Sequence, residues 1–313
     1  MRHTTFRQLE IFEAIARLGS FTRAAEELHL TQPTVSMQMK KLTDAVNAPL
    51  CEQVGKKIYL TDTGRALAQA AREVFGILDR FEMSVAEQQG LKKGRLRLMV
   101  ITTASYFAPR LLGEFARLHP GIEVALSVTN RERVLASIGD NLEDLYFLGQ
   151  PPENIDVVAQ PFMENPLVVV AAPDHPLAGK RRIPLKRLAG EPWLMREPGS
   201  GTRKALERKF AEHGLEPDIR MELGANEAIK QAILAGLGIS VLSRHSLALH
   251  APGQFAILDV EGFPIRRQWY AVYPAGRQLS AVTRTFLDFL LSYGKTYDCG
   301  PVQPTAPAAR PAA

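Results

Sequence analysis

Residues 19–36 read GSFTRAAEELHLTQPTVS, and the interpretation of the N-terminal part of the chain starts from this stretch. Ser20 can cap a helix, because its hydroxyl can accept a hydrogen bond from an unpaired amide of the first turn. Thr31 can cap another helix in the same way, after a tight turn. An earlier helix is predicted over residues 5–18. The three helices predict a helix-turn-helix over about Phe21 to Lys40.

The third predicted helix, Thr31 to Val46, has an outer face without acidic residues. No acid occurs between Glu27 and Asp44, whereas a solvated helix face usually mixes both signs. Amides and hydroxyls near its start suit base edges in the major groove, and lysines further along suit phosphates. A plain solvated helix is the alternative, which the preceding helix and turn disfavour. The predicted DNA contacts are Thr31, Gln32, Pro33, Thr34, Ser36, Gln38, Lys40 and Lys41.

A short β-hairpin is predicted after this helix. Two extended runs flank Gly55, Lys56 and Lys57, a pattern typical of a hairpin with a tight turn. Lys56 and Lys57 would offer two cations to the DNA backbone. A charged loop tip without function is the alternative, but a wing directly after a helix-turn-helix is favoured. Residues 1–61 are therefore interpreted as a winged helix-turn-helix domain of the α+β class.

One long helix is predicted next, within a linker that spans residues 62–92. Its apolar residues are spaced alternately by four and three, which is typical of a coiled coil. No other predicted helix nearby is free to cover them, so a second copy of the chain is expected to do so. A dimer in turn predicts a pseudo-palindromic site on double-stranded DNA. The predicted dimerisation residues are Leu67, Ala71, Val74, Leu78, Phe81 and Val85.

Residues 93–297 alternate short apolar strands with helices, which predicts an α/β domain with parallel strands. Two such units with two crossovers indicate a two-lobed, periplasmic-binding-protein-like effector domain. The first lobe is predicted over about 93–162 and 268–297, and the second over about 163–267. Folds of this kind bind ligands between the lobes. The Pro- and Ala-rich residues 298–313 are expected to be a disordered tail.

Hydroxyl and glycine residues before predicted helices indicate a site for a small anionic effector. Glycines let backbone amides turn inward, hydroxyls add donors, and a helix N-terminus favours negative charge. The alternative is that these residues only cap their helices. Candidates from opposite sides of the predicted cleft favour ligand binding. The predicted effector residues are Thr102, Thr103, Asn130, Ser200, Gly201, Thr202, Arg203 and Asn226.

Composition excludes several classes of protein. Hydrophobic residues make up 46% and charged residues 23% of the 313 residues, which argues against overall disorder. No run of about 18 apolar residues occurs, so no transmembrane helix or membrane partner is expected. The start of the chain lacks the apolar stretch of a secretory signal. Only two cysteines occur, Cys51 and Cys299, which excludes a disulfide framework and a zinc finger and favours a reducing cytoplasm.

Catalytic motifs are missing from the sequence. No HExxH, Walker A or GxSxG pattern occurs, and the histidines have no metal-ligand spacing. His245 and His250 are expected at the surface. The run from Gly236 to Gly238 begins like a dinucleotide-binding loop, but it lacks the third glycine and is interpreted as a helix C-cap. We therefore expect no enzyme activity, no metal and no cofactor.

Two groups of segments resemble a known family. LEIF at residues 9–12, together with residues 19–36, resembles the N-terminal signature of the LysR-type transcriptional regulators. The resemblance covers about residues 4–295. Segments of the C-terminal half resemble the branch of this family that regulates rubisco and Calvin-cycle operons. They are PPE at 151–153, ENPLVV at 164–169, REPGSGTR at 196–203, NEAIKQA at 226–232 and VEGFPIRRQWY at 260–270.

The resemblance implies a cytoplasmic activator of carbon-fixation genes that forms a tetramer, as a dimer of dimers, and has RNA polymerase as a partner. It also implies an effector that is a phosphorylated sugar, a related phosphometabolite or a nicotinamide dinucleotide phosphate. A regulator of another metabolic operon is the alternative within the family. A solute-binding protein or small enzyme with an accessory helical domain is the alternative outside it, disfavoured by the absence of a signal peptide and of catalytic motifs.

Two positions of the wing and one segment of the effector domain depart from the family pattern. Cys51 stands where the family usually has Phe, and Gln53 replaces a basic residue of the wing. The packing of the wing and one phosphate contact are therefore open, with Lys56 or Lys57 as a substitute for the contact. Residues 146–148, Tyr-Phe-Leu, are bulkier than the family's usual small-residue strand, which predicts a different wall for the nearby pocket.

Overall fold

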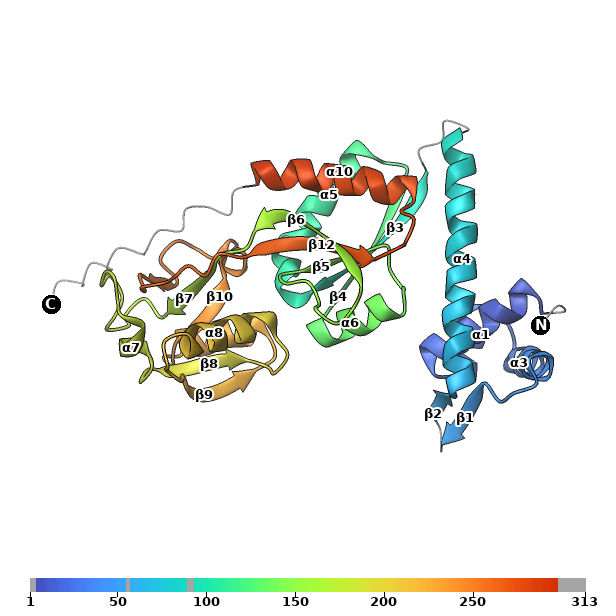
Figure 1. Cartoon of the computed structure of the whole chain (residues 1–313), viewed down its shortest axis with the longest axis horizontal. Coiled ribbons are helices and arrows are strands. Elements are labelled where there is room, and N and C mark those ends of the chain that lie inside the picture. The colour runs from blue at the N-terminus through green and yellow to red at the C-terminus, as the bar shows by residue number, and fades with distance from the viewer. Residues whose placement is uncertain (1–3, 55–56, 89–92, 298–313) are drawn as a thin grey trace. The chain divides into compact units, whose positions relative to one another are not determined.

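The computed structural model describes residues 4–54, 57–88 and 93–297, and Figure 1 labels its elements. The contacts divide the chain into two compact units. One is formed by Met1–Val85 with Asp140–Leu142, and the other by Ala86–Gly139 with Glu143–Ala313. Lys56 and the predicted tail 298–313 lie outside the described residues. No helix among the described residues is both long and apolar enough to cross a membrane.

The first unit begins with three short helices whose predicted starts are confirmed. The Thr5 hydroxyl accepts from the Gln8 amide in a reciprocal capping box, and Ser20 and Thr31 cap the next two helices through the amides of Arg23 and Thr34. A two-stranded antiparallel hairpin and one long helix follow. The elements are α1 (Phe6–Leu18), α2 (Phe21–Glu27), α3 (Gln32–Val46), β1 (Cys51–Val54), β2 (Lys57–Leu60) and α4 (Asp62–Gln88).

The core of this unit joins the three short helices to the first turns of α4. Val35, Met39 and Leu42 form the buried face of α3, at the predicted helical spacing. Leu67 of α4 lies in the same cluster, and Ala71 is also buried, at 1% exposure. These two residues were predicted to face a second chain. That prediction is wrong for Leu67, because the winged domain of its own chain already covers it, and Ala71 is likewise buried within its own chain.

The second unit has a first lobe built on a five-stranded sheet with the order β4-β3-β5-β12-β6. β3 is parallel to β4 and β5, whereas β12 is antiparallel to both β5 and β6. The strands are β3 (Gly94–Ile101), β4 (Ile122–Thr129), β5 (Leu145–Leu148), β6 (Val157–Glu164) and β12 (Gln268–Pro274). The helices are η1 (Thr102–Tyr106), α5 (Ala108–Leu118), α6 (Arg131–Gly139) and α10 (Ala281–Thr296).

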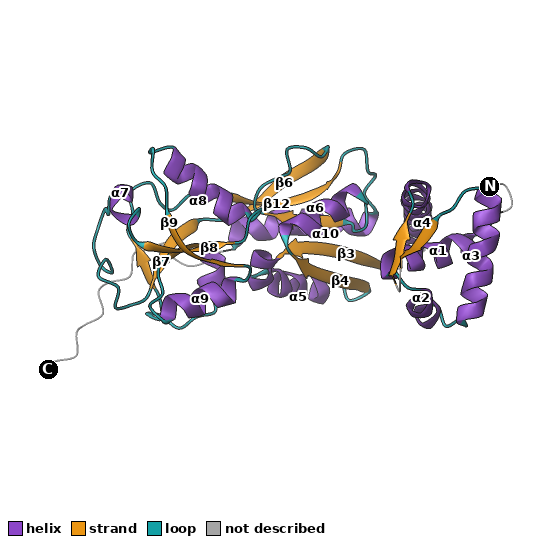
Figure 2. Cartoon of the chain, turned by 90° about the horizontal axis from the view of Figure 1, so that it is seen from below, coloured by secondary structure: helices purple, strands orange, loops and turns teal. Residues whose placement is uncertain are grey.

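The second lobe contains two small sheets. β7 lies between β10 and β11 in an antiparallel sheet, and β8 pairs with β9 in parallel. Figure 2 shows α8 and α9 on opposite sides of the β8–β9 pair. The strands are β7 (Leu167–Ala171), β8 (Pro192–Arg196), β9 (Asp218–Leu223), β10 (Ser240–Ser243) and β11 (Ala256–Leu258). The helices are α7 (Leu185–Leu188), α8 (Gly201–Ala211), α9 (Asn226–Leu234) and η2 (Arg244–Leu247).

Two adjacent crossovers connect the lobes. The Asn165 amide donates to the Arg267 carbonyl at 2.7 Å, and Leu167 and Ile265 exchange two backbone hydrogen bonds of 3.0 Å. β6 leaves the first lobe along one crossover and β12 returns along the other, so these strands run in opposite directions. The predicted parallel pairing holds for β3, β4 and β5 but not for β12 and β6, and the two-lobed α/β architecture is confirmed.

Candidate functional site

The outer face of α3 carries polar groups that make few contacts with the rest of their unit. Gln32, Lys40 and Lys41 are exposed, and so are Thr31 and Pro33 at the helix start. The Gln32 amide nitrogen donates to the Ser36 hydroxyl at 2.9 Å, one turn further along. These groups form one contiguous strip of donors and cations on a rigid helix.

Three predicted residues of this face are half-buried rather than exposed. They are Thr34, Ser36 and Gln38. The Thr34 hydroxyl hydrogen-bonds the Thr31 hydroxyl at 2.8 Å, and the Gln38 side-chain oxygen accepts from Gln8 of α1 at 3.3 Å. The Gln38 oxygen thus helps to hold α3 against α1, while its amide nitrogen remains available as a donor.

The predicted hairpin is present, but Lys57 is the first residue of β2, opposite Val54, and does not belong to the turn. Cys51 is half-buried in β1 and packs against the core of the winged domain. Burial raises the pKa of its thiol to about 11. The thiol is therefore protonated near neutral pH and acts as a small apolar group. Lys56 and the side chains of Gln53 and Lys57 lie outside the described residues, so the predicted phosphate contacts remain predictions.

The later part of α4 leaves large apolar side chains uncovered within its own unit. Phe81 is 65% exposed, Ile77 56% and Leu78 38%. Val74 and Val85 are half-buried. Ile77 was not among the predicted dimerisation residues, because it lies one position before Leu78 and outside the strict heptad spacing. An exposed apolar stripe of this kind usually marks an interface.

A narrow pocket lies between the two lobes of the second unit. Its volume is about 20 Å³, little more than one water molecule needs. Thr102 and Thr103 line it from the first lobe, and Ser200, Gly201 and Thr202 line it from the second, as predicted. The complete lining is Ile101, Thr102, Thr103, Arg131, Gly149, Asn165, Arg196, Glu197, Ser200, Gly201, Thr202, Arg267 and Trp269.

Two hydroxyls of this pocket are not used as helix caps. Ser200 precedes α8 and is buried, yet its hydroxyl makes no capping hydrogen bond. In the described part of the chain, neither the Ser200 nor the Thr202 hydroxyl has a hydrogen-bond partner. Both hydroxyls therefore remain available to a ligand in the pocket. The capping alternative is thus contradicted for Ser200.

Arg196 is the centre of the polar network in the pocket. It is 5% exposed, and its guanidinium donates to both Glu197 carboxylate oxygens at 2.7 and 2.8 Å. It also donates to Asn226 at 2.7 Å and, across the lobes, to the Thr102 hydroxyl at 3.4 Å. Asn226 in turn donates to the Thr103 hydroxyl at 3.2 Å. Asn226 therefore positions Arg196 and Thr103 and does not itself line the pocket.

Arg267 lies where the second crossover enters β12. Its guanidinium donates to the Gly149 carbonyl at 2.5 Å and to the Gly201 carbonyl at 2.8 Å, so it spans the lobes. A Cβ atom at Gly149 would lie 2.9 Å from this guanidinium, and one at Gly201 would lie 3.3 Å from it. Glycine at these two positions therefore permits the close approach. Burial and the nearby Arg131 and Arg208 lower the pKa of Arg267 to about 10.

Two predicted effector residues lie elsewhere. Arg203 donates to Glu207 at 2.7 Å and to Glu222 at 2.6 Å, which neutralise it outside the pocket. Its place on α8, one position after Thr202, turns it away. The Asn130 side chain accepts from the Arg133 amide at 3.0 Å, so it caps α6 and does not line the pocket. Neither residue lines the narrow pocket, so their contact with the effector remains a prediction without support from this geometry.

Arg131, Arg196 and Arg267 bring three cations to the pocket against one carboxylate, Glu197. Sequence reasoning missed all three arginines, because they come from a helix, a strand and a crossover that are far apart in the chain. Arg131 donates to the Gln150 carbonyl at 2.7 Å, and burial lowers its pKa. The excess of positive charge suits an anion.

A second polar cluster connects the lobes beside this pocket. The Tyr106 hydroxyl of the first lobe donates to the Glu227 carboxylate of α9 at 2.7 Å. Lys230, which is 1% exposed, donates to the same oxygen at 2.6 Å and contacts His250 at 2.7 Å. Burial and Glu227 raise the pKa of Tyr106. The cluster holds the lobes together in the closed arrangement.

Neither of the two histidines predicted at the surface is fully exposed, and His250 is half-buried beside Lys230. His245 is 1% exposed, and its Nε2 lies 2.8 Å from the Glu164 carbonyl, so the prediction is wrong for this residue.

Gly236 has a φ of +72° after α9, in agreement with the predicted C-cap. No group of three or more His, Cys, Asp or Glu side chains that could hold a metal occurs among the described residues.

The geometry defines a class of protein: a winged helix-turn-helix with a free recognition face, followed by a two-lobed domain with an anion pocket. Comparison with known families agrees. A model of the bacterial regulatory helix-turn-helix protein, lysR family, matches residues 6–65, and a model of the LysR substrate binding domain matches residues 89–295. The chain belongs to the LysR family of transcriptional regulators.

Individual relatives cover nearly the whole chain. The HTH-type transcriptional activator CmpR of Synechocystis sp. is 54% identical over 94% of this chain and 97% of its own length. The RuBisCO operon transcriptional regulator of Acidithiobacillus ferrooxidans is 49% identical over 97% and 99% of the two chains. The HTH-type transcriptional regulator CbbR of Rhodospirillum rubrum is 43% identical over 93% and 97%.

Solved structures are similar in both parts of the chain. The regulatory domain of Synechocystis CcmR, solved in complex with 2-PG, is 55% identical with a TM-score of 0.63. It covers 65% of this chain and 99% of its own. Full-length CbnR complexed with its target DNA is 22% identical with a TM-score of 0.56, over 93% and 99% of the two chains. At that identity the likeness concerns the fold alone.

Proposed function

We propose that this LysR-type regulator activates carbon-fixation genes in response to a small phosphorylated anion bound between the lobes of its second unit. It acts in the cytoplasm as a regulator and not as an enzyme. Its partners are a pseudo-palindromic operator in double-stranded DNA, RNA polymerase and further copies of itself, as a dimer and then a tetramer. The similarity to RuBisCO operon regulators and to CmpR supports the target genes.

The observation that carries the proposal is the pocket at the start of α8. It combines an excess of arginines with two hydroxyls that have no partner in the described part of the chain. The first amides of α8 add donors at the positive end of the helix dipole. We propose that Thr102, Ser200, Thr202, Arg196 and Arg267 hold the phosphate and carboxylate groups of the effector.

The size of the pocket supports a conformational response. A volume of about 20 Å³ is too small for a metabolite, so the lobes must separate or rearrange to admit one. The relative CcmR was solved with 2-PG, 2-phosphoglycolate, which carries a phosphate and a carboxylate. We propose 2-phosphoglycolate as a ligand of this chain. It regulates transcription only through unequal affinity for the two lobe arrangements.

A pair of variants on α3 tests the proposed DNA contacts. Gln32→Ala is expected to reduce discrimination at one base pair by about 1–3 kcal/mol, because its amide is placed for a base edge. Lys41→Ala is expected to weaken all duplexes alike and to reduce the salt dependence of binding, because a lysine on phosphate carries no sequence information. Gel-shift titrations on operator and random DNA at several salt concentrations measure both effects.

Two controls make this experiment decisive. Lys180→Ala removes an exposed lysine of the second unit and is expected to leave both measurements unchanged. Footprints recorded with and without 2-phosphoglycolate test the effector separately from the DNA contacts. If Gln32→Ala weakened all duplexes alike and Lys41→Ala reduced sequence discrimination, the proposed placement of α3 in the major groove would be contradicted. A weak, salt-independent affinity for the upstream region would favour a solute-binding protein or an enzyme.

A further inference from the structure

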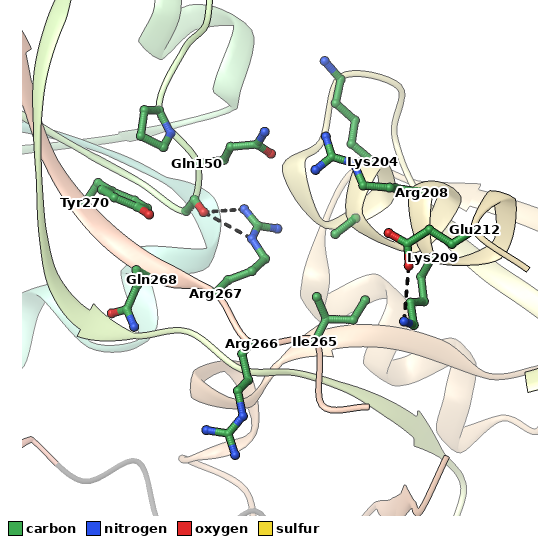
Figure 3. Close-up of a pocket in the computed structure, with 13 residues that line it drawn as sticks. Gln150, Lys204, Arg208, Lys209, Glu212, Ile265, Arg266, Arg267, Gln268 and Tyr270 are labelled. Atoms are coloured by element: carbon green, nitrogen blue, oxygen red, sulfur yellow. Dashed lines mark hydrogen bonds and ion pairs between the residues drawn. The ribbon is translucent and has the colours of Figure 1, made fainter. Parts of the chain in front are cut away.

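A second and much larger pocket lies on the other side of Arg267 from the narrow one. Its volume is about 580 Å³, within the range of metabolite-binding sites. It shares Arg267 and Gly149 with the narrow pocket. Figure 3 shows Lys204 and Arg208 on the α8 side, Gln150 and Tyr270 on the opposite side, and Arg267 between them.

The charges in this pocket are unbalanced. Lys204 and Arg208 lie one turn apart on α8, where like charges repel each other. Neither forms an ion pair or side-chain hydrogen bond with the described residues, and Arg267 donates only to backbone carbonyls. The carboxylate in the lining, Glu212, is paired with Lys209 at 3.3 Å. Three positive charges therefore face one space without a carboxylate partner.

The position of these cations differs from that of ordinary surface residues. Arg267 is half-buried, and burial together with the charges of Arg131 and Arg208 lowers its pKa. Figure 3 also shows Arg266 pointing away from the other cations, so it does not belong to the group. Gln150, Gln268 and Tyr270 add neutral donors along the opposite wall. An anion in this space would relieve the repulsion and accept hydrogen bonds from both walls.

We propose that this pocket is a second ligand site, distinct from the narrow interlobe pocket, and that it binds a diphosphate or bisphosphate group through Lys204, Arg208 and Arg267. Three unneutralised cations match a ligand with at least two negative charges. The volume leaves room for the organic part of such a metabolite. Since Lys204 and Arg208 belong to the second lobe and Gln150 to the first, the ligand would contact both lobes.

The test uses inorganic pyrophosphate as the probe and the full-length protein in isothermal titration calorimetry. Lys204→Gln with Arg208→Gln is expected to weaken pyrophosphate binding at least about tenfold, because charge-assisted hydrogen bonds are lost. Orthophosphate is expected to bind more weakly than pyrophosphate to the unmodified protein. The matched control is Lys180→Gln with Arg181→Gln, which removes the same charge from an exposed segment of the same lobe.

A variant of the narrow pocket distinguishes this site from the effector site of the proposed function. Thr202→Val alters the narrow pocket only and is expected to weaken 2-phosphoglycolate while leaving pyrophosphate affinity unchanged. Absence of pyrophosphate binding would overturn the second site. The second site would also be overturned if the Lys204→Gln, Arg208→Gln variant and the Lys180→Gln, Arg181→Gln control lost pyrophosphate affinity equally. A loss of pyrophosphate binding in Thr202→Val would overturn it as well. Failure of 2-phosphoglycolate to bind would contradict the proposed effector and leave the pyrophosphate result intact.

Discussion

The recognition face of α3 and the interlobe pocket differ in how their polar groups are held. On α3, Gln32, Lys40 and Lys41 are exposed and contiguous along one helix. In the pocket, Arg196 is buried and has partners just after β8, on α9 and in the other lobe. The first region is an open surface that a large partner can approach, and the second is an interior network that a small ligand must enter.

This difference has a consequence for assembly. The pocket is lined by both lobes of the second unit. The α3 face is a single short helix, which can read only one half of a symmetric DNA site. DNA affinity should therefore depend on pairing two chains, whereas effector affinity should not.

The largest expected effect comes from breaking that pairing. Leu78→Ser with Phe81→Ser removes exposed apolar side chains from α4 and is expected to yield monomers. DNA affinity is then expected to fall at least about 100-fold, because two linked half-sites bind far more tightly than one. Sedimentation and gel shift measure the two effects, and calorimetry with 2-phosphoglycolate should show no change.

Leu249→Ser is the matched control, since Leu249 is 78% exposed but lies in the second unit. It should leave both the mass and the DNA affinity unchanged. A double variant that remains dimeric would show that the stripe on α4 is not the dimer contact. A monomer that retained full operator affinity would contradict the dependence on two half-sites.

An intermediate effect is expected inside the pocket. Arg196→Met removes a bidentate partner of Glu197 and leaves that carboxylate near the site of the anion. We expect 2-phosphoglycolate affinity to fall about 10- to 100-fold. Arg196→Lys should not restore it, because an ammonium group cannot hold two carboxylate oxygens and Asn226 in one plane. Calorimetry measures affinity, and gel shift without effector checks that basal DNA binding is intact.

The control for this variant is Arg187→Met. Arg187 is exposed in the same lobe and pairs with Glu191 at 3.2 Å, so its loss should matter little. Normal affinity in Arg196→Lys would mean that only charge is required at this position. The pocket would then not depend on a fixed network of hydrogen bonds, and it would no longer differ in this respect from the open face of α3.

The same contrast explains what the sequence could predict. The helix starts at Thr5, Ser20 and Thr31 follow from local hydrogen bonding, so cap and pattern rules located them. The face of α3 followed from spacing within one helix. The assignment of Leu67 to a second chain failed, because the preceding winged domain packs against the start of the helix and buries it.

In the effector domain, the predictable part was again local. Ser200 and Thr202 stand before a helix in a glycine-containing loop, and both line the pocket. Arg196 and Arg267 come from a strand and a crossover about 70 positions apart, and no local pattern relates them. Arg203 looked equivalent to its neighbours in sequence, but the turn of the helix directs it to Glu207 and Glu222.

The smallest expected effect concerns Cys51, where the wing departs from the family pattern. Because burial raises the pKa of this thiol to about 11, the reactive thiolate is scarce at pH 8. In Cys299→Ser protein, iodoacetamide should alkylate Cys51 at least about tenfold more slowly than it alkylates the urea-unfolded chain. The rate should keep rising up to about pH 11, since each step toward the folded pKa ionises more thiol. Mass spectrometry measures the rate.

A rate that levels off near pH 9, as for an exposed thiol, would mean that Cys51 is not packed against the winged domain. The wing would then lack the apolar contact that a Phe at this position would make, and a polar replacement such as Cys51→Ser should cost no stability.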